Sequence, residues 1–180
     1  EQHVHNLDIL NWYLGHPNSA LGFGMRARRK TGNQFDFFSV DFEMPEGVHI
    51  HSMCRQVNGT DGGVYEHFVG SDRVVEGVEP KDKQVFPEGC PYNGNAYVQE
   101  HIDLLWSIMK GQPINEAGNV ATSTMMAIMG RIASYTGKKV QWKHLMDANG
   151  GRPDLYNLTL KPSAEDFEKY GRGCKIWVSE

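Results

Sequence analysis

The sequence lacks the features that would assign it at once to a membrane, nucleic-acid or nucleotide-binding class. No apolar run approaches the roughly 18 residues needed to cross a bilayer. The formal net charge is only −4, and the basic residues at 26–30 are offset by acidic stretches elsewhere, so we expect no nucleic-acid partner and no membrane association. No G-x-G-x-x-G or Walker-type loop is present, so the chain has no phosphate cradle for a nucleotide of its own.

Cysteine is also scarce. Three cysteines, Cys54, Cys90 and Cys174, are spread over 180 residues and form no C-x-x-C pair. This spacing argues against a zinc site and against a disulfide framework. Free thiols favour a reducing compartment, so we expect a cytoplasmic location, with a periplasmic one left open.

The composition that remains is typical of a globular protein. The hydrophobic fraction is 39% and the charged fraction 22%, and a chain of this length closes a substantial core. We therefore expect a single domain over residues 1–180, with a less ordered tail over about 147–180 where glycine and proline recur.

Hydrophobic periodicity predicts the elements of this domain. Apolar residues at three-to-four spacing predict helices at 2–14, from about 95 to 110, and at 116–136, with Asn115 and Gly137 as caps of the last. Alternation predicts strands at 20–30, 35–44, 48–55, 64–69 and 139–142, and the tail adds a short helix at 164–170 and a strand at 175–178. This order predicts an α+β fold with a mostly antiparallel sheet and flanking helices.

The patterns also predict which faces are buried. Alternate residues of a strand point to the same face, and in strand 35–44 the apolar set predicts the buried face. This set comprises Phe38, Val40, Phe42 and Met44. Phe35 and Phe37 have the opposite parity, which leaves part of the second sheet face for a partner subunit to cover. For helix 116–136 the predicted buried seam comprises Ala121, Met125, Ile128, Ile132 and Tyr135.

The first five residues, E-Q-H-V-H, contain the strongest candidate for chemistry. On a helix, Glu1 lies beside His5 and His5 lies beside Asp8, because residues three and four apart are neighbours. Two carboxylates would favour the imidazolium form, which suits a group that takes up and returns a proton near neutral pH. The alternative is that Glu1 complements the helix N-terminus while His5 lies on a solvated face.

Two H-x-H pairs, at His3 and His5 and at His49 and His51, raise the question of a metal site. On a strand such a pair points both rings to one face, but on a helix residues i and i+2 do not face each other. His49 and His51 have no clear further ligands at strand spacing. We therefore expect no metal, and a polar strand face instead.

Three stretches resemble a known family: EQHVHNLDILNWYLGHPNSALGFGMRARR, FDFFSVDFEMPEGVHIHSMCRQVNG and YVQEHIDLLWSIMKGQPINEAGNVATSTMMAIMGRIASYTGKKV. They are similar to the C-terminal domain of the glucose-fructose oxidoreductase, inositol dehydrogenase and rhizopine-catabolism (Gfo/Idh/MocA) family, in a bacterial subgroup of dehydrogenases. The resemblance implies an open-faced sheet with flanking helices that serves substrate binding and dimerisation. It also implies a separate N-terminal Rossmann domain, outside this chain, that holds NAD or NADP and supplies a lysine, with helix 2–14 at the hinge.

The resemblance also implies site residues. The family pattern is an Asp, three intervening residues and a His, which places His5 as the proton-transfer residue and Glu1 as its carboxylate companion. Glu stands here for the usual Asp, and His3 stands where a glycine is common, so His3 could share or take the role. The remaining substrate contacts implied are Asn6, Asp8, Arg55 and Tyr92.

The implied reaction is hydride transfer between nicotinamide and a hydroxyl group of a sugar or polyol, catalysed by the full-length protein and not by this fragment. The resemblance further implies a homo-oligomer formed through the open sheet face. Two alternatives stay open: a domain of a glycosidase that uses bound NAD, and a dimerisation module without chemistry.

Overall fold

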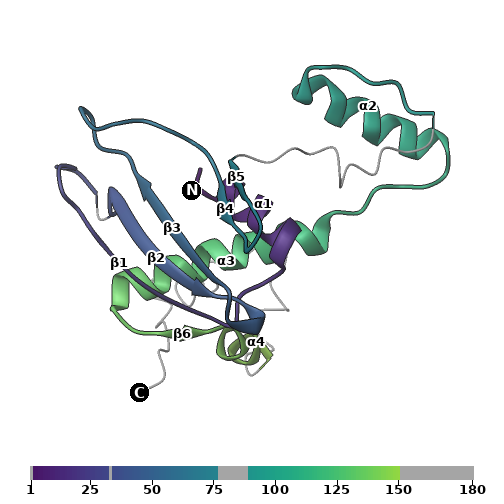
Figure 1. Cartoon of the computed structure of the whole chain (residues 1–180). Helices are drawn as coiled ribbons and strands as arrows, with labels where there is room; N and C mark the ends of the chain where they lie inside the picture. Colours follow the sequence, from purple (N-terminus) through teal and green to yellow (C-terminus); the bar gives the residue numbers. More distant parts are fainter. Residues whose placement is uncertain (1, 33, 77–88, 151–180) are drawn as a thin grey trace, which may run out of the picture. The chain divides into compact units, whose positions relative to one another are not determined.

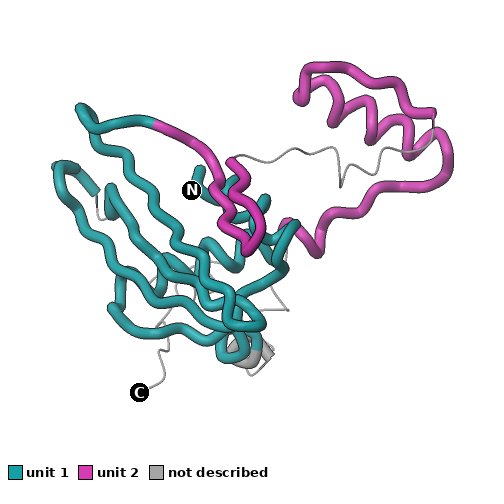
Figure 2. Tube along the Cα trace, in the orientation of Figure 1, with its two compact units in different colours: residues 1–62, 122–180 teal, residues 63–121 magenta. Residues whose placement is uncertain are grey.

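The computed structural model describes residues 2–32, 34–76 and 89–150. They form two compact units (Figure 2), one drawn from residues 1–62 and 122–180 and the other from residues 63–121. The expected single domain spans both units and stays a prediction. The expected helix at 164–170 and strand at 175–178 lie outside the described residues, as does most of the tail.

Unit 1 is built on a four-stranded sheet with the order β3-β2-β1-β6. The strands are β1 (Ser19–Met25), β2 (Phe37–Glu43), β3 (His49–Arg55) and β6 (Val140–Gln141), and each neighbouring pair is antiparallel. The β2–β3 connection is a short 3-10 turn, η1 (Pro45–Gly47), in which Glu46 and Gly47 both have positive φ. The predicted α+β class with an antiparallel sheet is thus confirmed.

Three helices belong wholly or mostly to this unit. Helix α1 (Val4–Leu14) ends at Gly15, whose φ is 74°. Helix α3 (Ala117–Thr136) begins after Asn115, whose Oδ1 accepts the Ala117 N–H at 3.2 Å, and ends at Gly137 with φ 67°. Both predicted caps of this helix are confirmed. Helix α4 (Trp142–Gly150) follows β6 directly and was not predicted.

The core of unit 1 lies between α3 and one face of the sheet, which we call the inner face (Figure 1). Met126, Met129 and Ala133 of α3 are completely buried, and the predicted inward parity of β2 is confirmed at Val40, Phe42 and Met44. Burial of each methionine, valine or phenylalanine side chain among these contributes about 1.5–3 kcal/mol. The core as a whole comprises Leu7, Ala20, Val40, Phe42, Met44, Ile50, Met126, Met129, Ile132, Ala133 and Val140.

Small residues allow α3 to approach the sheet closely. A Cβ atom added to Gly22 of β1 would lie 2.8 Å from Val40 Cγ2 and 2.9 Å from Ser134 Oγ. A Cβ atom on Gly130 of α3 would lie 3.0 Å from the Phe42 ring. Glycine inside a strand normally weakens it, but Gly22 of β1 is required here by the close packing of α3 on the sheet.

The predicted seam of α3 is only partly right: Ile132 is buried and Met125 and Tyr135 are half-buried. Ala121 and Ile128 are exposed, and the helix turns Met126, Met129 and Ala133 to the sheet instead. The physical reason is the close approach at Gly130 and Ser134, which a count of large apolar side chains does not detect.

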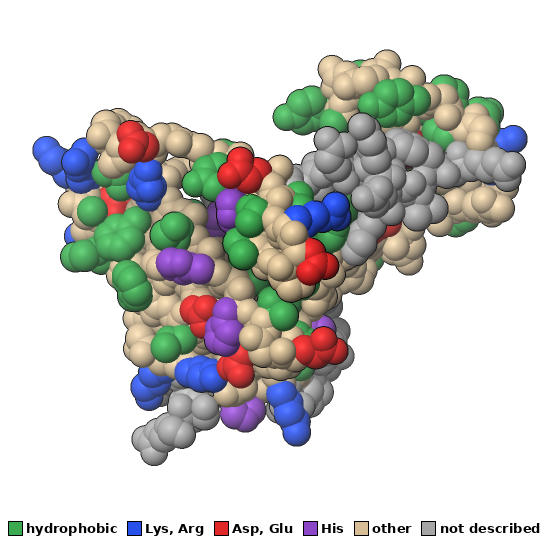
Figure 3. Space-filling model, viewed as in Figure 1, with side chains coloured by type: hydrophobic (Ala, Val, Ile, Leu, Met, Phe, Trp, Pro, Cys, Tyr) green, Lys and Arg blue, Asp and Glu red, His purple; other side chains and the backbone are tan. Residues whose placement is uncertain are grey.

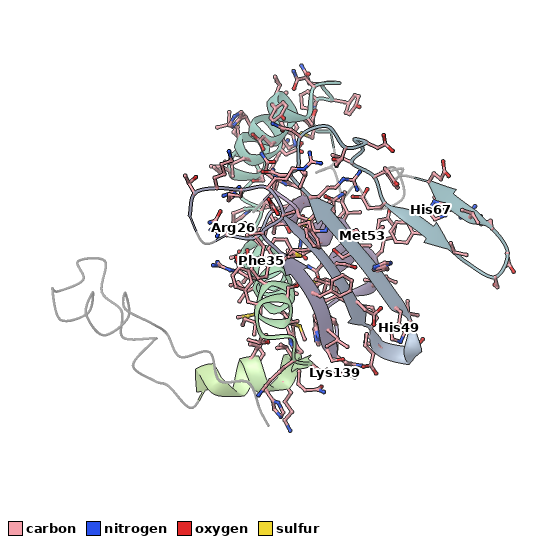
Figure 4. The ribbon with its side chains drawn as sticks, turned by 90° about the vertical axis from the view of Figure 1, so that its left-hand side faces the viewer. Arg26, Phe35, His49, Met53, His67 and Lys139 are labelled. Carbon is pink, nitrogen blue, oxygen red and sulfur yellow. The ribbon has the colours of Figure 1, made fainter. Side chains whose placement is uncertain are left out.

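The predicted position of Phe35 is wrong as well. Its ring stacks on Tyr135 of α3 with centroids 3.9 Å apart, and its N–H donates to the Tyr135 hydroxyl at 2.9 Å, so it lies on the helix side (Figure 4). Residue 35 precedes β2, so the alternation of side chains between the two faces of the strand does not apply to it. Phe37 does follow the expected outward parity, opposite Met25 and Arg55.

Unit 2 contains a small hairpin and one helix. Strands β4 (His67–Val69) and β5 (Val74–Glu76) pair antiparallel, of which β5 was not predicted. Helix α2 (Ala96–Met109) begins after Asn95, whose side chain accepts the Tyr97 N–H at 3.0 Å. In the described part of the chain, no helix is both long and apolar enough to span a membrane.

Candidate functional site

The first turn of α1 lies against the inner face of β3 and contains the candidate histidines. His3 Nε2 and Ser52 Oγ are 2.6 Å apart. Ser52 is buried in the middle of β3, between the inward residues Ile50 and Cys54. A residue of the N-terminal helix is thus tied to the sheet by a short hydrogen bond.

The environment of His3 keeps its imidazole neutral. Burial lowers the pKa of His3 below its ordinary value of 6.5, and a hydrogen bond with Asn6 acts in the opposite direction. A neutral ring has one N–H donor and one acceptor nitrogen. His3 is therefore uncharged near pH 7 and keeps both hydrogen-bonding roles.

His5 has a different environment. It is exposed, and its ring has no hydrogen-bond partner among the residues that the structure describes. No described residue of unit 1 occupies its ring nitrogens, which leaves them for a ligand that approaches α1. Glu1, its predicted carboxylate companion, lies outside the described residues, and its role stays a prediction.

Asp8 anchors α1 to α3. Its Oδ1 accepts a hydrogen bond from the Ser123 hydroxyl, and the Asn11 side-chain amide donates to the same Ser123 Oγ at 3.1 Å. Ser123 and Asn11 are both buried. One oxygen of Asp8 therefore faces α3, and its proposed contact with substrate or with His5 stays a prediction.

The other predicted contacts are dispersed. Arg55 has the outward parity of β3, and its guanidinium donates to Thr60 Oγ1 at 3.0 Å and to the Asp61 carbonyl. It therefore lies on the sheet face opposite to the His3–Ser52 contact. Tyr92 belongs to unit 2 and is 74% exposed. For both residues, contact with substrate stays a prediction.

The second H-x-H pair occupies the open face of the sheet, which we call the outer face. His49 Nδ1 lies 2.8 Å from Asp41 Oδ2, and His51 Nε2 lies 2.9 Å from Ser39 Oγ. Within residues 2–32, 34–76 and 89–150, no group of three or more His, Cys, Asp or Glu side chains could hold a metal ion. The pair forms polar cross-strand contacts on an exposed surface.

Sequence reasoning missed Ser52, Ser123 and Gln56. Gln56 donates through Nε2 to Gln2 Oε1 at 2.9 Å, which joins the segment after β3 to the start of α1. Ser52 offered a detectable signal, because it is a polar residue at a buried position between apolar neighbours on the same parity. Ser123 and Gln56 had no such signal.

Known proteins resemble this chain in sequence and in fold. No family model matches. A curated relative, the 4-hydroxy-3-methylbut-2-enyl diphosphate reductase of Chlorobaculum parvum, is 31% identical over 149 residues, which cover 74% of this chain and 42% of that protein.

Among solved structures, myo-inositol 2-dehydrogenase from Lactobacillus plantarum matches 77% of this chain and 46% of its own with a TM-score of 0.56 at 15% identity. A myo-inositol dehydrogenase from Corynebacterium glutamicum matches 77% of this chain and 47% of its own, with a TM-score of 0.55 at 15% identity. GenD2 of gentamicin A biosynthesis, solved with NAD, matches 78% of this chain and 46% of its own, with a TM-score of 0.54 at 16% identity.

These matches establish the fold. The chain shares the architecture of about half of each of these oxidoreductases, as the family resemblance implied. It spans less than half the length of each of these four proteins. The activity of a whole protein therefore does not follow from the comparison alone.

Proposed function

We propose that this chain is the substrate-binding domain of an oxidoreductase of the Gfo/Idh/MocA type. The full-length protein would transfer hydride between NAD or NADP and a hydroxyl group of a sugar or polyol in the cytoplasm. The observation that carries the proposal is the fold shared with inositol dehydrogenases over 77% of the chain, with an exposed histidine in the first turns of the expected hinge helix.

We propose a separate role for each histidine. Oxidation of an alcohol to a carbonyl group releases a hydride, which the nicotinamide ring accepts when it is bound, and a proton, which needs a base. His5 offers accessible ring nitrogens for that proton. His3, neutral and bonded to Ser52, holds the first turn of α1 on the sheet and would orient the substrate hydroxyl.

The chain offers no nucleotide-phosphate loop, so the cofactor would be held mainly by another domain. Residues of this chain fit the substrate-binding half of such an active site. A positioned histidine beside asparagine and serine side chains suits a polyhydroxylated substrate, because these groups both donate and accept hydrogen bonds.

A substrate screen tests the proposal. The full-length protein that contains this chain is incubated with NAD or NADP and a panel of inositols, hexoses and linear polyols, and nicotinamide reduction is followed by absorbance. We expect reduction with at least one polyol, and none when the 180-residue chain replaces the full-length protein. Full-length protein that reduces no nicotinamide with any panel member and binds neither nucleotide would contradict the proposal.

We also propose that a second copy of the chain covers the outer face. Four apolar side chains of this face are exposed: Leu21 by 49%, Phe23 by 66%, Met25 by 55% and Met53 by 66%. The register places Phe23 and Met53 on either side of Ser39. Figure 3 shows apolar side chains grouped on this face, toward the end where β2 begins. A contiguous patch of this kind is typical of an interface between subunits.

The assembly state of the 180-residue chain tests this interface. Phe23→Glu combined with Met53→Glu would place charges in the apolar patch of both copies, so the dimer should dissociate. We expect the molar mass by light scattering to fall from that of a dimer to that of a monomer. Val64→Glu, which alters a residue that is 87% exposed in unit 2, is the matched control and should leave the mass unchanged. A monomeric wild-type chain, or a dimeric double variant, would contradict the proposal.

A further inference from the structure

A pocket of about 290 Å³ opens in unit 1 at the end of the sheet. Two segments form it: the loop between β1 and β2, and the segment that follows β3. Its lining consists of Arg28, Arg29, Asp36, Gln56, Val57 and Asn58. The volume lies at the small end of the range of ligand pockets, which suits a single small group.

Asp36 fixes the backbone of the loop. Its Oδ1 accepts the Ala27 N–H at 2.6 Å, and its Oδ2 accepts the N–H groups of Arg28 and Arg29, each at 2.8 Å. These hydrogen bonds hold the pKa of Asp36 at about 2. Because Asp36 is buried and both of its oxygens are bonded to the loop, its negative charge is offset by the peptide groups around it.

The two arginines keep most of their donors for other partners. Arg28 Nη1 donates to the Asn58 carbonyl at 2.5 Å, and Arg29 Nη1 donates to Gln34 Oε1 at 3.3 Å. Neither guanidinium forms an ion pair with an acidic side chain in the described part of the chain. Each guanidinium has five N–H groups, so several stay available at the pocket.

The surroundings of the pocket are also positive. Arg26 and Lys30 lie in the same loop, which gives four basic residues within five positions in a chain of net charge −4. Figure 3 shows basic side chains at this end of the sheet, and Figure 4 marks Arg26 there. Planar guanidinium groups beside the side-chain amides of Gln56 and Asn58 match a ligand with several acceptor oxygens.

We propose that this pocket binds the phosphate group of a small molecule. Gln56 lines the pocket and donates to Gln2, the residue before His3, so the pocket lies beside the first turn of α1. If the proposed oxidoreductase function holds, on which this extension rests, one substrate could place its phosphate here and a hydroxyl at the histidines. A phosphorylated polyol and the phosphate of a nicotinamide nucleotide share this chemistry, and the test separates them.

The test uses the ¹⁵N-labelled 180-residue chain titrated with inorganic phosphate in 150 mM NaCl. The amide signals of Ala27, Arg28 and Arg29 report on the pocket directly. We expect saturable shifts with a dissociation constant in the millimolar range or below. A hexose phosphate should bind more tightly than the unphosphorylated hexose. Tighter binding of NADP than of the hexose phosphate would assign the pocket to the cofactor instead of the substrate.

The variant Arg28→Gln/Arg29→Gln should weaken phosphate binding at least tenfold. The variant Arg73→Gln/Lys110→Gln, which removes the same number of positive charges from unit 2, should not. Thermal unfolding of each variant checks that the loop is still folded. Phosphate shifts that do not saturate, or that are equal in the wild type and the double variant, would overturn the proposal. Because binding is measured without turnover, a chain that binds phosphate while the full-length protein reduces no nicotinamide would contradict only the proposed function.

Discussion

Replacing His5 with alanine in the full-length protein is expected to lower turnover by about 10²- to 10⁴-fold, the usual contribution of a positioned acid–base group. The affinity for the nicotinamide nucleotide should stay nearly unchanged, because the chain has no phosphate loop of its own and His5 is not expected to contact the cofactor's phosphates. The measurements are steady-state kinetics with the substrate found in the screen and nucleotide binding by fluorescence titration.

His3→Ala is the matched comparison, because His3, unlike His5, has a hydrogen-bond partner among the described residues. It is tied to buried Ser52, so its loss should disturb the first turn of α1 and raise KM more than it lowers kcat. Ser52→Ala should reproduce this effect. Unchanged turnover in His5→Ala would reject His5 as the base, and a loss confined to His3→Ala would transfer the role to His3.

Gly22→Ala is expected to destabilise unit 1 by about 1–3 kcal/mol, the usual cost of overpacking a dense core. The added methyl group would meet Val40 Cγ2 at 2.8 Å, and Ser134 Oγ and the Ser39 carbonyl oxygen each at 2.9 Å. Because a strand backbone atom is among these neighbours, the clash cannot be relieved by rotating a side chain. The free energy of unfolding from urea titration measures the effect.

Gly62→Ala is the control for this substitution. An added Cβ at Gly62 meets nothing within 4 Å, so its stability should stay within about 0.5 kcal/mol of the wild type, as for ordinary surface changes. Equal stability of the Gly22 and Gly62 variants would show that α3 does not press on β1 as closely as described.

Much of the fold could be predicted because its signals are local. Alternation from Phe38 to Met44 predicts an inward parity, and the structure confirms it at Val40, Phe42 and Met44. Helix 2–14 and the caps of α3 follow from spacing and from the residues Asn115 and Gly137. These features depend on neighbours within a few positions in the chain, which is the range over which periodicity and capping act.

The candidate site was predicted less completely. The pattern of the first five residues identified His3 and His5, but it treated His5 and Asp8 as a pair on one helix face. The structure shows that Asp8 is bonded to Ser123, which lies 115 positions away in the chain. It also shows that His3 is bonded to Ser52. Contacts between distant segments leave no periodic trace in the sequence.

The sequence by itself determined the types of the main elements, though not α4 or β5, together with the inward-facing residues of the central strand and the two histidines as candidates for chemistry. Each of these depends on local geometry. Only the tertiary structure decided which side of α3 faces the sheet, where Phe35 lies and which histidine is half-buried against Ser52. These depend on how closely two elements pack, and that distance is set by small residues on both elements, such as Gly22 and Gly130.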